Sequence, residues 1–347
     1  MIAQAKEFLG KDWTLYEQLF AQTLDSRIPI LNKVNQYLME RSGKQLRPIL
    51  CLLAAHLCSG CCSEASVSCA VASEQIHTAT LLHDEVADEA DTRRGMPTVS
   101  ALLSPRAAVL VGDFWLSRAV EAIVSNCQKE TFSDFARCLG DLAEGEMFQI
   151  EKAADLDTGY DDYIYIIAHK TASLFRAAMK GGARNSGATQ AQIEAVDTFA
   201  YHLGLAFQMR DDILDYSPQL SLGKPTGVDI AERKITLPLL GALANAEASK
   251  AAADGCAPGA ADARVPGVAG GLGEAASSVR ASVVADIEAG RFDAVMDFVR
   301  DNGGIEYAQK ILEAETRSAI EALEAFGPCP ARELLSALAG CLCLREK

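Results

Sequence analysis

Apolar side chains recur every three or four residues along most of this chain, the spacing of an amphipathic α-helix. Strict alternation of apolar and polar positions, which is typical of a half-buried strand, is nearly absent. We therefore expect helices over residues 2–22, 27–41, 46–59, 64–89, 98–126, 132–154, 160–183, 189–216, 233–249, 275–289, 291–302, 303–326 and 330–345. Most of these segments are apolar on a broad face, so they should pack as an all-α bundle.

One segment departs from this pattern. Residues 251–275 are rich in Ala and Gly and contain no aromatic side chain. This composition is typical of a flexible surface insertion between two helices. A chain of 347 residues is long enough for two domains. Because the candidate site residues extend from Lys44 to Lys234, we instead expect one domain over residues 1–347.

Two carboxylate clusters stand out within the predicted helices. Each has acids at positions i, i+1 and i+4, which share one face of a helix about a turn long. They are Asp84, Glu85 and Asp88, and Asp211, Asp212 and Asp215. Like charges at i, i+4 cost a helix about 0.2–0.5 kcal/mol per pair, and a bound cation would remove that cost. Oxygen ligands without nearby cysteine favour Mg²⁺.

Two simpler explanations stay open for these clusters. The first cluster could be a solvated helix end with ordinary ion pairs, and the second a buried ion-pair network around Arg210. Against them, Ser73, His77 and Thr80 precede the first cluster on the same helical stripe. Gln208 likewise shares a face with the second cluster, and Gly204 allows close helix packing or room for a ligand.

Basic residues gather near the clusters. They are Lys44 and Arg47 before a helix, Arg93 and Arg94 after the first cluster, Lys170 beside Thr171, Lys224 in a Gly-Lys-Pro-Thr-Gly loop, and Lys234. Each alone is a common surface cation, and none fits the Walker A pattern. Together with the carboxylates they predict a site for two polyphosphate groups. Carboxylate-held Mg²⁺ would bind one group, and Lys, Arg and His the other.

Composition and charge exclude several classes of protein. The net charge of −15 argues against a nucleic-acid surface, which needs a basic footprint. The sequence contains no run of about 18 apolar residues, so we expect no membrane span. The first residues lack the basic and apolar regions of a signal peptide. The 11 cysteines are irregularly spaced, so we expect reduced thiols in a cytoplasm. Cys58 and Cys61 have no partner pair at zinc spacing, which argues against a metal role for them.

The order of these motifs resembles the trans-polyprenyl diphosphate synthases, in particular long-chain types such as octaprenyl and heptaprenyl diphosphate synthases. The resemblance runs through GKQLRP, HTATLLHDEVADEADTRRGMPT, HKTASLF, FQMRDDILDYS, GKPTGVD and KITLPLL. It implies an isoprenoid synthase-type helical bundle around a deep central cavity, usually as a homodimer. It also implies Mg²⁺-dependent, head-to-tail addition of isopentenyl diphosphate to an allylic diphosphate, such as farnesyl or geranylgeranyl diphosphate.

The resemblance further implies roles for the motif residues. Asp84 and Asp88 would bind two Mg²⁺, and Asp211 a third, supported through water by Asp212 and Asp215. Isopentenyl diphosphate would be bound by Lys44, Arg47, His77 and Arg94, and the allylic diphosphate by Arg93, Lys170, Thr171, Gln208, Lys224 and Lys234. The family's first motif usually reads DDxxD, whereas Glu85 occupies its second position here. We expect Glu85 to support the metal ligands, with a modest effect on activity.

Product length is the last implication of the resemblance. In this family, the residues four and five positions before the first Asp form the floor for the growing tail. Here these are Thr80 and Ala79, with Ile76 and Ser73 deeper along the helix. None is a large aromatic, which predicts a long all-trans product of about C30–C50, whose burial would make release slow. Membrane lipid or a membrane enzyme would take up the product, and a respiratory quinone side chain is its commonest use.

Three alternatives remain at this point. A shorter product, about C15–C20, keeps the enzyme class but not the tunnel. A class I terpene cyclase shares the first motif, although its second usually contains Asn and Ser, where this chain has DDILD. A non-catalytic partner subunit usually loses carboxylates from its motifs, and both motifs are retained here.

Overall fold

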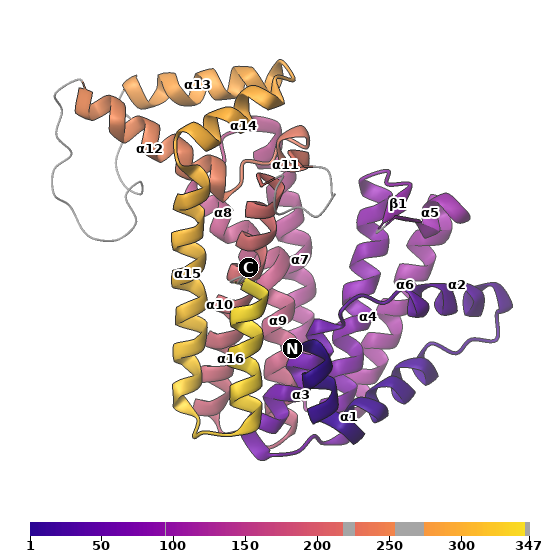
Figure 1. Ribbon diagram of the computed structural model, residues 1–347. Helices are drawn as coiled ribbons and strands as arrows, with labels where there is room; N and C mark the ends of the chain where they lie inside the picture. Colours follow the sequence, from indigo (N-terminus) through magenta and orange to yellow (C-terminus); the bar gives the residue numbers. More distant parts are fainter. Residues whose placement is uncertain (94, 218–225, 254–273, 344–347) are drawn as a thin grey trace. The chain divides into compact units, whose positions relative to one another are not determined.

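The computed structural model describes residues 1–93, 95–217, 226–253 and 274–343, and these are almost entirely helical (Figure 1). The α-helices are α1 (Ile2–Thr23), α2 (Pro29–Glu40), α3 (Leu46–Ser59), α4 (Glu64–Ala87), α5 (Val99–Leu102), α6 (Pro105–Asn126), α7 (Lys129–Asp155), α8 (Tyr160–Ile167), α9 (Ser173–Asn185), α10 (Gln190–Asp215), α11 (Val228–Ala231), α12 (Leu237–Ala253), α13 (Glu274–Glu288), α14 (Phe292–Asp301), α15 (Gly304–Ala322) and α16 (Pro330–Cys343). The all-α prediction is confirmed.

Several predicted boundaries were wrong for local reasons. The segment 98–126 is not one helix, because Ser104 caps a new helix by accepting a hydrogen bond from the Ala107 backbone nitrogen, with Pro105 in the first turn. A short antiparallel pair, β1 (Thr92–Arg93) and β2 (Met96–Pro97), was not predicted. The segment 160–183 is interrupted by the π-helical turn η1 (Ala168–Ala172), and the 3₁₀ turn η2 (Leu323–Ala325) follows α15.

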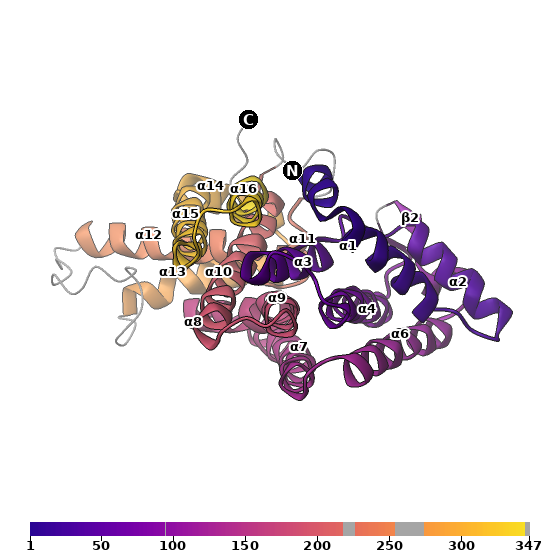
Figure 2. The same cartoon turned by 90° about the horizontal axis from the view of Figure 1, so that it is seen from below.

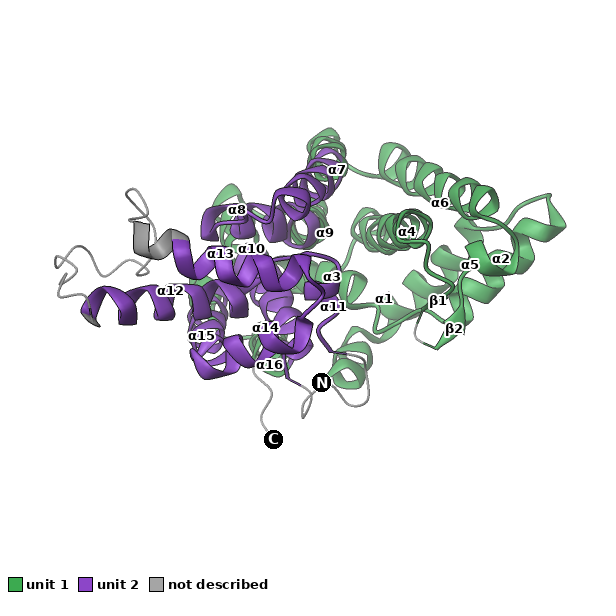
Figure 3. Cartoon of the chain, turned by 90° about the horizontal axis from the view of Figure 1, so that it is seen from above, with its two compact units in different colours: residues 1–139, 174–200, 320–341 green, residues 140–173, 201–319, 342–347 purple. Residues whose placement is uncertain are grey.

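The chain divides into two compact units, which Figure 3 colours separately. Unit 1 contains residues 1–139, 174–200 and 320–341, and unit 2 contains residues 140–173, 201–319 and 342–347. The first acidic motif lies in unit 1 and the second in unit 2. The expectation of a single domain over residues 1–347 stays a prediction.

Helix α4 forms the centre of unit 1. It packs against α1, α3 and α6, which surround it when unit 1 is seen along the helix axis in Figure 2. Ser73, Ile76 and Ala79 are at most 1% exposed, so this face of α4 is part of the core. A buried polar chain crosses the same unit: Trp115 Nε1 donates to Asn35 Oδ1 at 2.9 Å, and Asn35 Nδ2 donates to the Leu24 carbonyl at 2.7 Å.

In unit 2, helix α12 packs against α13 and α14, and also contacts α8. The predicted insertion at 251–275 begins within α12 and ends within α13, while residues 254–273 lie outside the described ranges. Among the helices of the described ranges, none combines the length and apolarity that a bilayer crossing requires.

Candidate active site

The π-helical turn η1 places Lys170 and Thr171 in unit 2. Such turns are rare and frequently lie at functional sites. Glycines on two neighbouring helices allow a close approach to this turn. A Cβ at Gly145 in α7 would lie 2.7 Å from His169 Cβ, and one at Gly204 in α10 would lie 2.5 Å from Ala172 Cα. Gly204 therefore serves close helix packing, the first of the two roles that the sequence left open.

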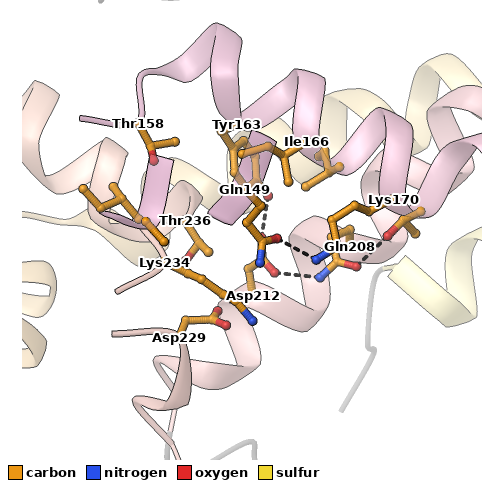
Figure 4. Close-up of a pocket in the computed structure, with 14 residues that line it drawn as sticks. Gln149, Thr158, Tyr163, Ile166, Lys170, Gln208, Asp212, Asp229, Lys234 and Thr236 are labelled. Carbon is orange, nitrogen blue, oxygen red and sulfur yellow. Dashed lines mark hydrogen bonds between the residues drawn. The ribbon is translucent and has the colours of Figure 1, made fainter. Parts of the chain in front are cut away.

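Lys170 and Thr171 line a pocket of about 140 Å³, shown in Figure 4. The pocket is also lined by Gln149, Ala153, Thr158, Tyr163, Ile166, Ile167, Gln208, Asp212, Asp229, Lys234, Ile235 and Thr236. Thus five residues predicted from the sequence meet in one place: Lys170, Thr171, Gln208, Asp212 and Lys234. Helices α7, α8 and α10, the turn η1 and the segment before α12 all contribute to the wall.

Hydrogen bonds fix the polar side chains of this pocket. Lys170 Nζ donates to Gln149 Oε1 at 2.8 Å and also forms an ion pair with Glu146. Thr171 Oγ1 donates to Gln208 Oε1 at 2.8 Å, and Gln208 Nε2 donates to Asp212 Oδ1 at 2.9 Å. This chain of donors sets the orientation of the Gln208 amide and connects η1 to the second acidic motif.

Asp212 is the buried carboxylate of the second motif. It is 5% exposed, and its Oδ2 accepts a 2.6 Å hydrogen bond from the Tyr163 hydroxyl. Burial raises the pKa of Asp212 to about 7, although the hydrogen bonds from Tyr163 and Gln208 oppose the rise. Burial also raises the pKa of Asp229 to about 8, helped by Asp212 and Asp215 and opposed by Lys234. Negative charge therefore accumulates in a buried place, where a cation would be favoured.

The other two acids of this motif face different surroundings. The Asp211 side chain is exposed. Both oxygens of Asp215 accept backbone hydrogen bonds, from the nitrogens of Val228 at 3.2 Å and Asp229 at 3.0 Å. Asp215 thereby holds the start of α11 beside the end of α10. Because α10 ends at Asp215, these acids lie at the negative end of the helix dipole, an unfavourable place that a bound cation would offset.

The first motif in unit 1 has a similar arrangement. Helix α4 ends at Ala87, and the Asp88 backbone nitrogen donates to the Asp84 carbonyl at 2.8 Å. Glu85 is buried at 7% exposure, whereas Asp84 is half-buried and Asp88 exposed. Burial raises the pKa of Glu85, while Arg93, whose Nε lies 3.9 Å from Glu85 Oε1, opposes the rise. In both motifs the second acid is thus the buried one, and the helix ends at or beside the last acid.

Three of the four residues assigned to isopentenyl diphosphate lie in the described part of the chain, and all three belong to unit 1. Lys44 is exposed before α3, and His77 is half-buried on α4. The Arg47 guanidinium lies over the Phe175 ring at 4.9 Å, and its buried Nε has no hydrogen-bond partner among the described residues. Burial lowers the pKa of Arg47, and Glu74 opposes this. Arg94 lies outside the described residues.

Among the residues assigned to the allylic diphosphate, Arg93 lies in unit 1 and pairs with Glu85. Lys224 lies outside the described residues. The four remaining residues line the pocket of unit 2. The residues assigned to the chain-length floor follow one another on α4, where Thr80 Oγ1 donates to the His77 carbonyl at 2.9 Å. The roles of all these residues stay predictions.

Comparison with known proteins identifies the family. The polyprenyl synthetase family model matches residues 28–260. This chain belongs to the polyprenyl synthetase family. It is 34% identical over 317 residues to the all-trans-nonaprenyl-diphosphate synthase (geranyl-diphosphate specific) of Rhodobacter capsulatus, covering 91% of this chain and 89% of that relative.

Two solved structures of polyprenyl synthetases share its fold. The decaprenyl diphosphate synthase of Rhodobacter capsulatus matches with a TM-score of 0.82 and 31% identity, covering 100% of both chains. The polyprenyl synthase of Caulobacter crescentus CB15, complexed with calcium and isoprenyl diphosphate, matches with a TM-score of 0.80 and 32% identity, covering 99% of this chain and 98% of that one. This polyprenyl synthetase is accordingly a prenyltransferase, and the resemblance inferred from its motifs is confirmed.

Among the pocket residues that were not predicted as site residues, three bear on the polar groups of this polyprenyl synthetase. Gln149 holds Lys170, Tyr163 holds Asp212, and Asp229 belongs to the buried acidic group. Asp229 ends the GKPTGVD motif, which is a usable signal. Gln149 and Tyr163 lie in helical segments with no distinguishing local pattern, so only the packing of α7 and α8 reveals them.

Proposed function

We propose that this polyprenyl synthetase condenses isopentenyl diphosphate head-to-tail with an allylic diphosphate and makes a long all-trans polyprenyl diphosphate. The observation that carries the proposal is the pocket of unit 2, where two lysines and the Thr171–Gln208 pair meet the buried Asp212. Cations and carboxylates in one pocket suit a diphosphate bound together with a divalent metal. The names of the relatives, nonaprenyl and decaprenyl diphosphate synthase, support a long product.

The donor set of the second motif fits Mg²⁺. The motif offers only carboxylate oxygens, and a cation bound there would favour the ionised form of Asp212, whose pKa burial raises. The exposed Asp211 would contact the metal, while Asp212 and Asp215, engaged by Tyr163 and by the backbone of α11, would orient its waters. Asp84 and Asp88 would hold two further ions, with Glu85 in support. Bound Mg²⁺ supplies stabilisation of negative charge on the diphosphate oxygens.

The residues of the pocket would then assist cleavage of the allylic C–O bond. Lys170, Lys234 and Thr171 carry donors that can bind diphosphate oxygens as their negative charge grows. Glu146 and Gln149 hold the Lys170 ammonium in place before substrate arrives, which reduces reorganisation. The double bond of isopentenyl diphosphate attacks the allylic cation, and the departing pyrophosphate takes the final proton. Exclusion of water protects the cation from quenching.

Unit 1 would bind isopentenyl diphosphate. The buried Nε of Arg47, which has no hydrogen-bond partner within the described ranges, is a donor whose desolvation an anionic ligand would offset. Lys44, His77 and Arg94 complete the proposed set. The small side chains of Ser73, Ala79 and Thr80, with Ile76, would leave room for a tail of about C30–C50. The protein would act in the cytoplasm. It would deliver its product to a membrane enzyme that builds a quinone.

A homodimer is the proposed assembly. Leu110 and Val124 on α6 are 58% and 60% exposed. They are 14 residues apart, so they lie within about 40° of each other around the helix. An exposed apolar stripe of this kind is typical of a covered face. Sedimentation velocity should show a dimer that the double substitution L110E/V124E converts to a monomer, whereas a wild-type monomer would contradict the proposal.

The deciding experiment supplies radiolabelled isopentenyl diphosphate, Mg²⁺, and either geranyl, farnesyl or geranylgeranyl diphosphate to the purified chain. A ladder that ends in one long polyprenol supports the proposal. A product of about C15–C20 would keep the enzyme class and refute the long tunnel. No incorporation by a folded sample, rescued by a second synthase subunit, would favour the partner-subunit alternative.

A further inference from the structure

A cluster of three different metal-ligating side chains lies in unit 1, formed by Asp12 of α1, His56 of α3 and Cys62 after α3. Their ligand atoms all lie within 4.8 Å of one another. His56 Nε2 lies 2.7 Å from Asp12 Oδ2. The Cys62 thiol donates a hydrogen bond to the Leu52 carbonyl at 3.6 Å, and the Asp12 carboxylate lies beside it as a second acceptor. The three atoms therefore converge on one point of the surface of unit 1.

The fold of α1 brings Asp12 to this point. Gly10 interrupts the helix with φ of 46° and ψ of −107°, a left-handed conformation that favours glycine. Residues on both sides of this kink then contact His56. The Phe8 ring meets the imidazole edge-on at 5.1 Å, and the Asp12 carboxylate binds the imidazole nitrogen. His56 and Asp12 are 14% and 25% exposed, so the cluster is partly enclosed yet reachable from solvent.

The donor set suits zinc more than magnesium. Thiolate, imidazole and carboxylate are the three ligand types of protein zinc sites, whereas Mg²⁺ prefers oxygen alone. Zinc–ligand bonds of about 2.0–2.3 Å at tetrahedral angles place ligand atoms roughly 3.3 Å apart or slightly more. The observed cluster is close to this spacing. The distance of 2.7 Å between Asp12 Oδ2 and His56 Nε2 would have to increase by less than about 1 Å.

We propose that Asp12, His56 and Cys62 bind one Zn²⁺ or a similar divalent transition metal, and that this ion fastens α1 to α3. Binding forms a Zn–S bond and breaks the Cys62 S–H bond, and the proton passes to the buffer. Because the thiol must lose its proton to bind the ion, affinity should increase with pH. Three protein ligands leave a fourth position for water. The site shares no residue with either carboxylate motif and does not depend on the proposed function.

The experiment uses the full-length, reduced, metal-free protein with excess Mg²⁺ to occupy the carboxylate motifs. Addition of Co²⁺ as a spectroscopic probe should produce one thiolate-to-metal charge-transfer band per chain, and addition of Zn²⁺ should remove it. Zn²⁺ alone should raise the Tm by stabilising the folded state. The matched pair of variants is Cys62→Ser, which should abolish the band and the Tm shift, and Cys61→Ser, an exposed neighbour that should retain both.

Two outcomes would overturn the proposal. The first is the absence of a thiolate band in the wild-type protein, which would leave the cluster as an ion pair beside a thiol. The second is an equal Zn²⁺ response in Cys62→Ser, which would move binding to other residues. If Cys62→Ser does not fold, Asp12→Asn replaces it. The zinc affinity of Asp12→Asn should fall by more than about tenfold, because mutation of even an outer-shell partner of a metal site causes a loss of this size. An unchanged zinc affinity would refute the site.

Discussion

The Tyr163 hydroxyl donates a 2.6 Å hydrogen bond to Asp212 Oδ2 and thereby joins α8 to the second acidic motif. The other oxygen of Asp212 is held by Gln208 at 2.9 Å. These two donors favour the ionised form of a carboxylate that burial would otherwise keep protonated. The orientation and charge of Asp212 are therefore set by its neighbours in the pocket.

Removing this donor should weaken metal binding. We expect Y163F to raise the Mg²⁺ concentration for half-maximal activity by about 10-fold or more, as loss of an outer-shell partner does. It should also lower stability by about 1–3 kcal/mol. Metal titration of initial rates measures the first effect, and thermal unfolding the second. Y165F, on the same helix with an exposed side chain, is the control, and equal effects in the two variants would argue against the assigned role.

The metal-free protein should lose stability as the pH rises. The folded state raises the pKa of Asp212 to about 7 and of Asp229 to about 8. Between the ordinary carboxyl pKa and these values the folded chain binds more protons than the unfolded chain, so the free energy of unfolding falls with increasing pH. We expect the Tm in EDTA to drop by a few degrees between about pH 5 and about pH 8.5.

Two comparisons test this assignment of the pH dependence. D212N should flatten the decrease, because it removes one of the titrating groups. Mg²⁺ at the higher pH should restore the Tm of the wild-type protein but restore less in D212N. A pH profile that is the same in D212N and wild type would show that other groups cause it.

The close approach of α7 to the π-helical turn should be sensitive to a single methyl group. G145A would place its Cβ 2.7 Å from His169 Cβ and 3.0 Å from Lys170 Cγ. Overpacking of this kind costs about 1–3 kcal/mol, and displacement of Lys170 should lower kcat/KM by about tenfold or more. In G140A, on the same helix, the new Cβ has nothing within 4 Å. That variant should keep its activity and gain up to about 1 kcal/mol, and equal behaviour of the two would contradict this explanation.

Replacement of Glu85 by Asp, the family's usual residue at this position, should have little effect on activity. It is buried and faces Arg93, so E85D keeps the charge while moving it by one methylene. We expect kcat/KM to change by less than about tenfold, whereas D88N should lower it by about 10²-fold or more. Steady-state rates with saturating Mg²⁺ provide the comparison. A large loss in E85D would mean that Glu85 contacts the metal directly.

Product length should respond to Ala79. This side chain is 1% exposed on α4, and A79F should shorten the final polyprenol by at least one isoprene unit. Chromatography of dephosphorylated products gives the length distribution. Ala70 is equally buried but lies nine residues away, about 180° around the helix, so A70F reports the effect of overpacking alone. Unchanged length in A79F, or equal shortening in both, would refute the floor assignment.

Local patterns were enough for much of the fold and site. Apolar periodicity predicted the long helices α1, α3, α7 and α10 to within a few residues. Four of the six residues assigned to the allylic diphosphate, Lys170, Thr171, Gln208 and Lys234, line one pocket. The interruption at Ala168–Ala172 escaped prediction because a π-helical turn keeps the residue types of an α-helix. The turn packs closely against Gly145 and Gly204, which lie far from it in sequence.

The sequence by itself determined the all-α class, the family and the places of the two acidic motifs, because helical periodicity and motif spacing are properties of neighbouring residues. Tertiary structure decided which carboxylates are buried. Glu85 and Asp212 are buried, whereas their neighbours Asp88 and Asp211 are exposed, because other elements pack against the first pair. Desolvation and hydrogen bonds from those elements set the proton affinity of each acid, so the division of roles within each motif follows from packing.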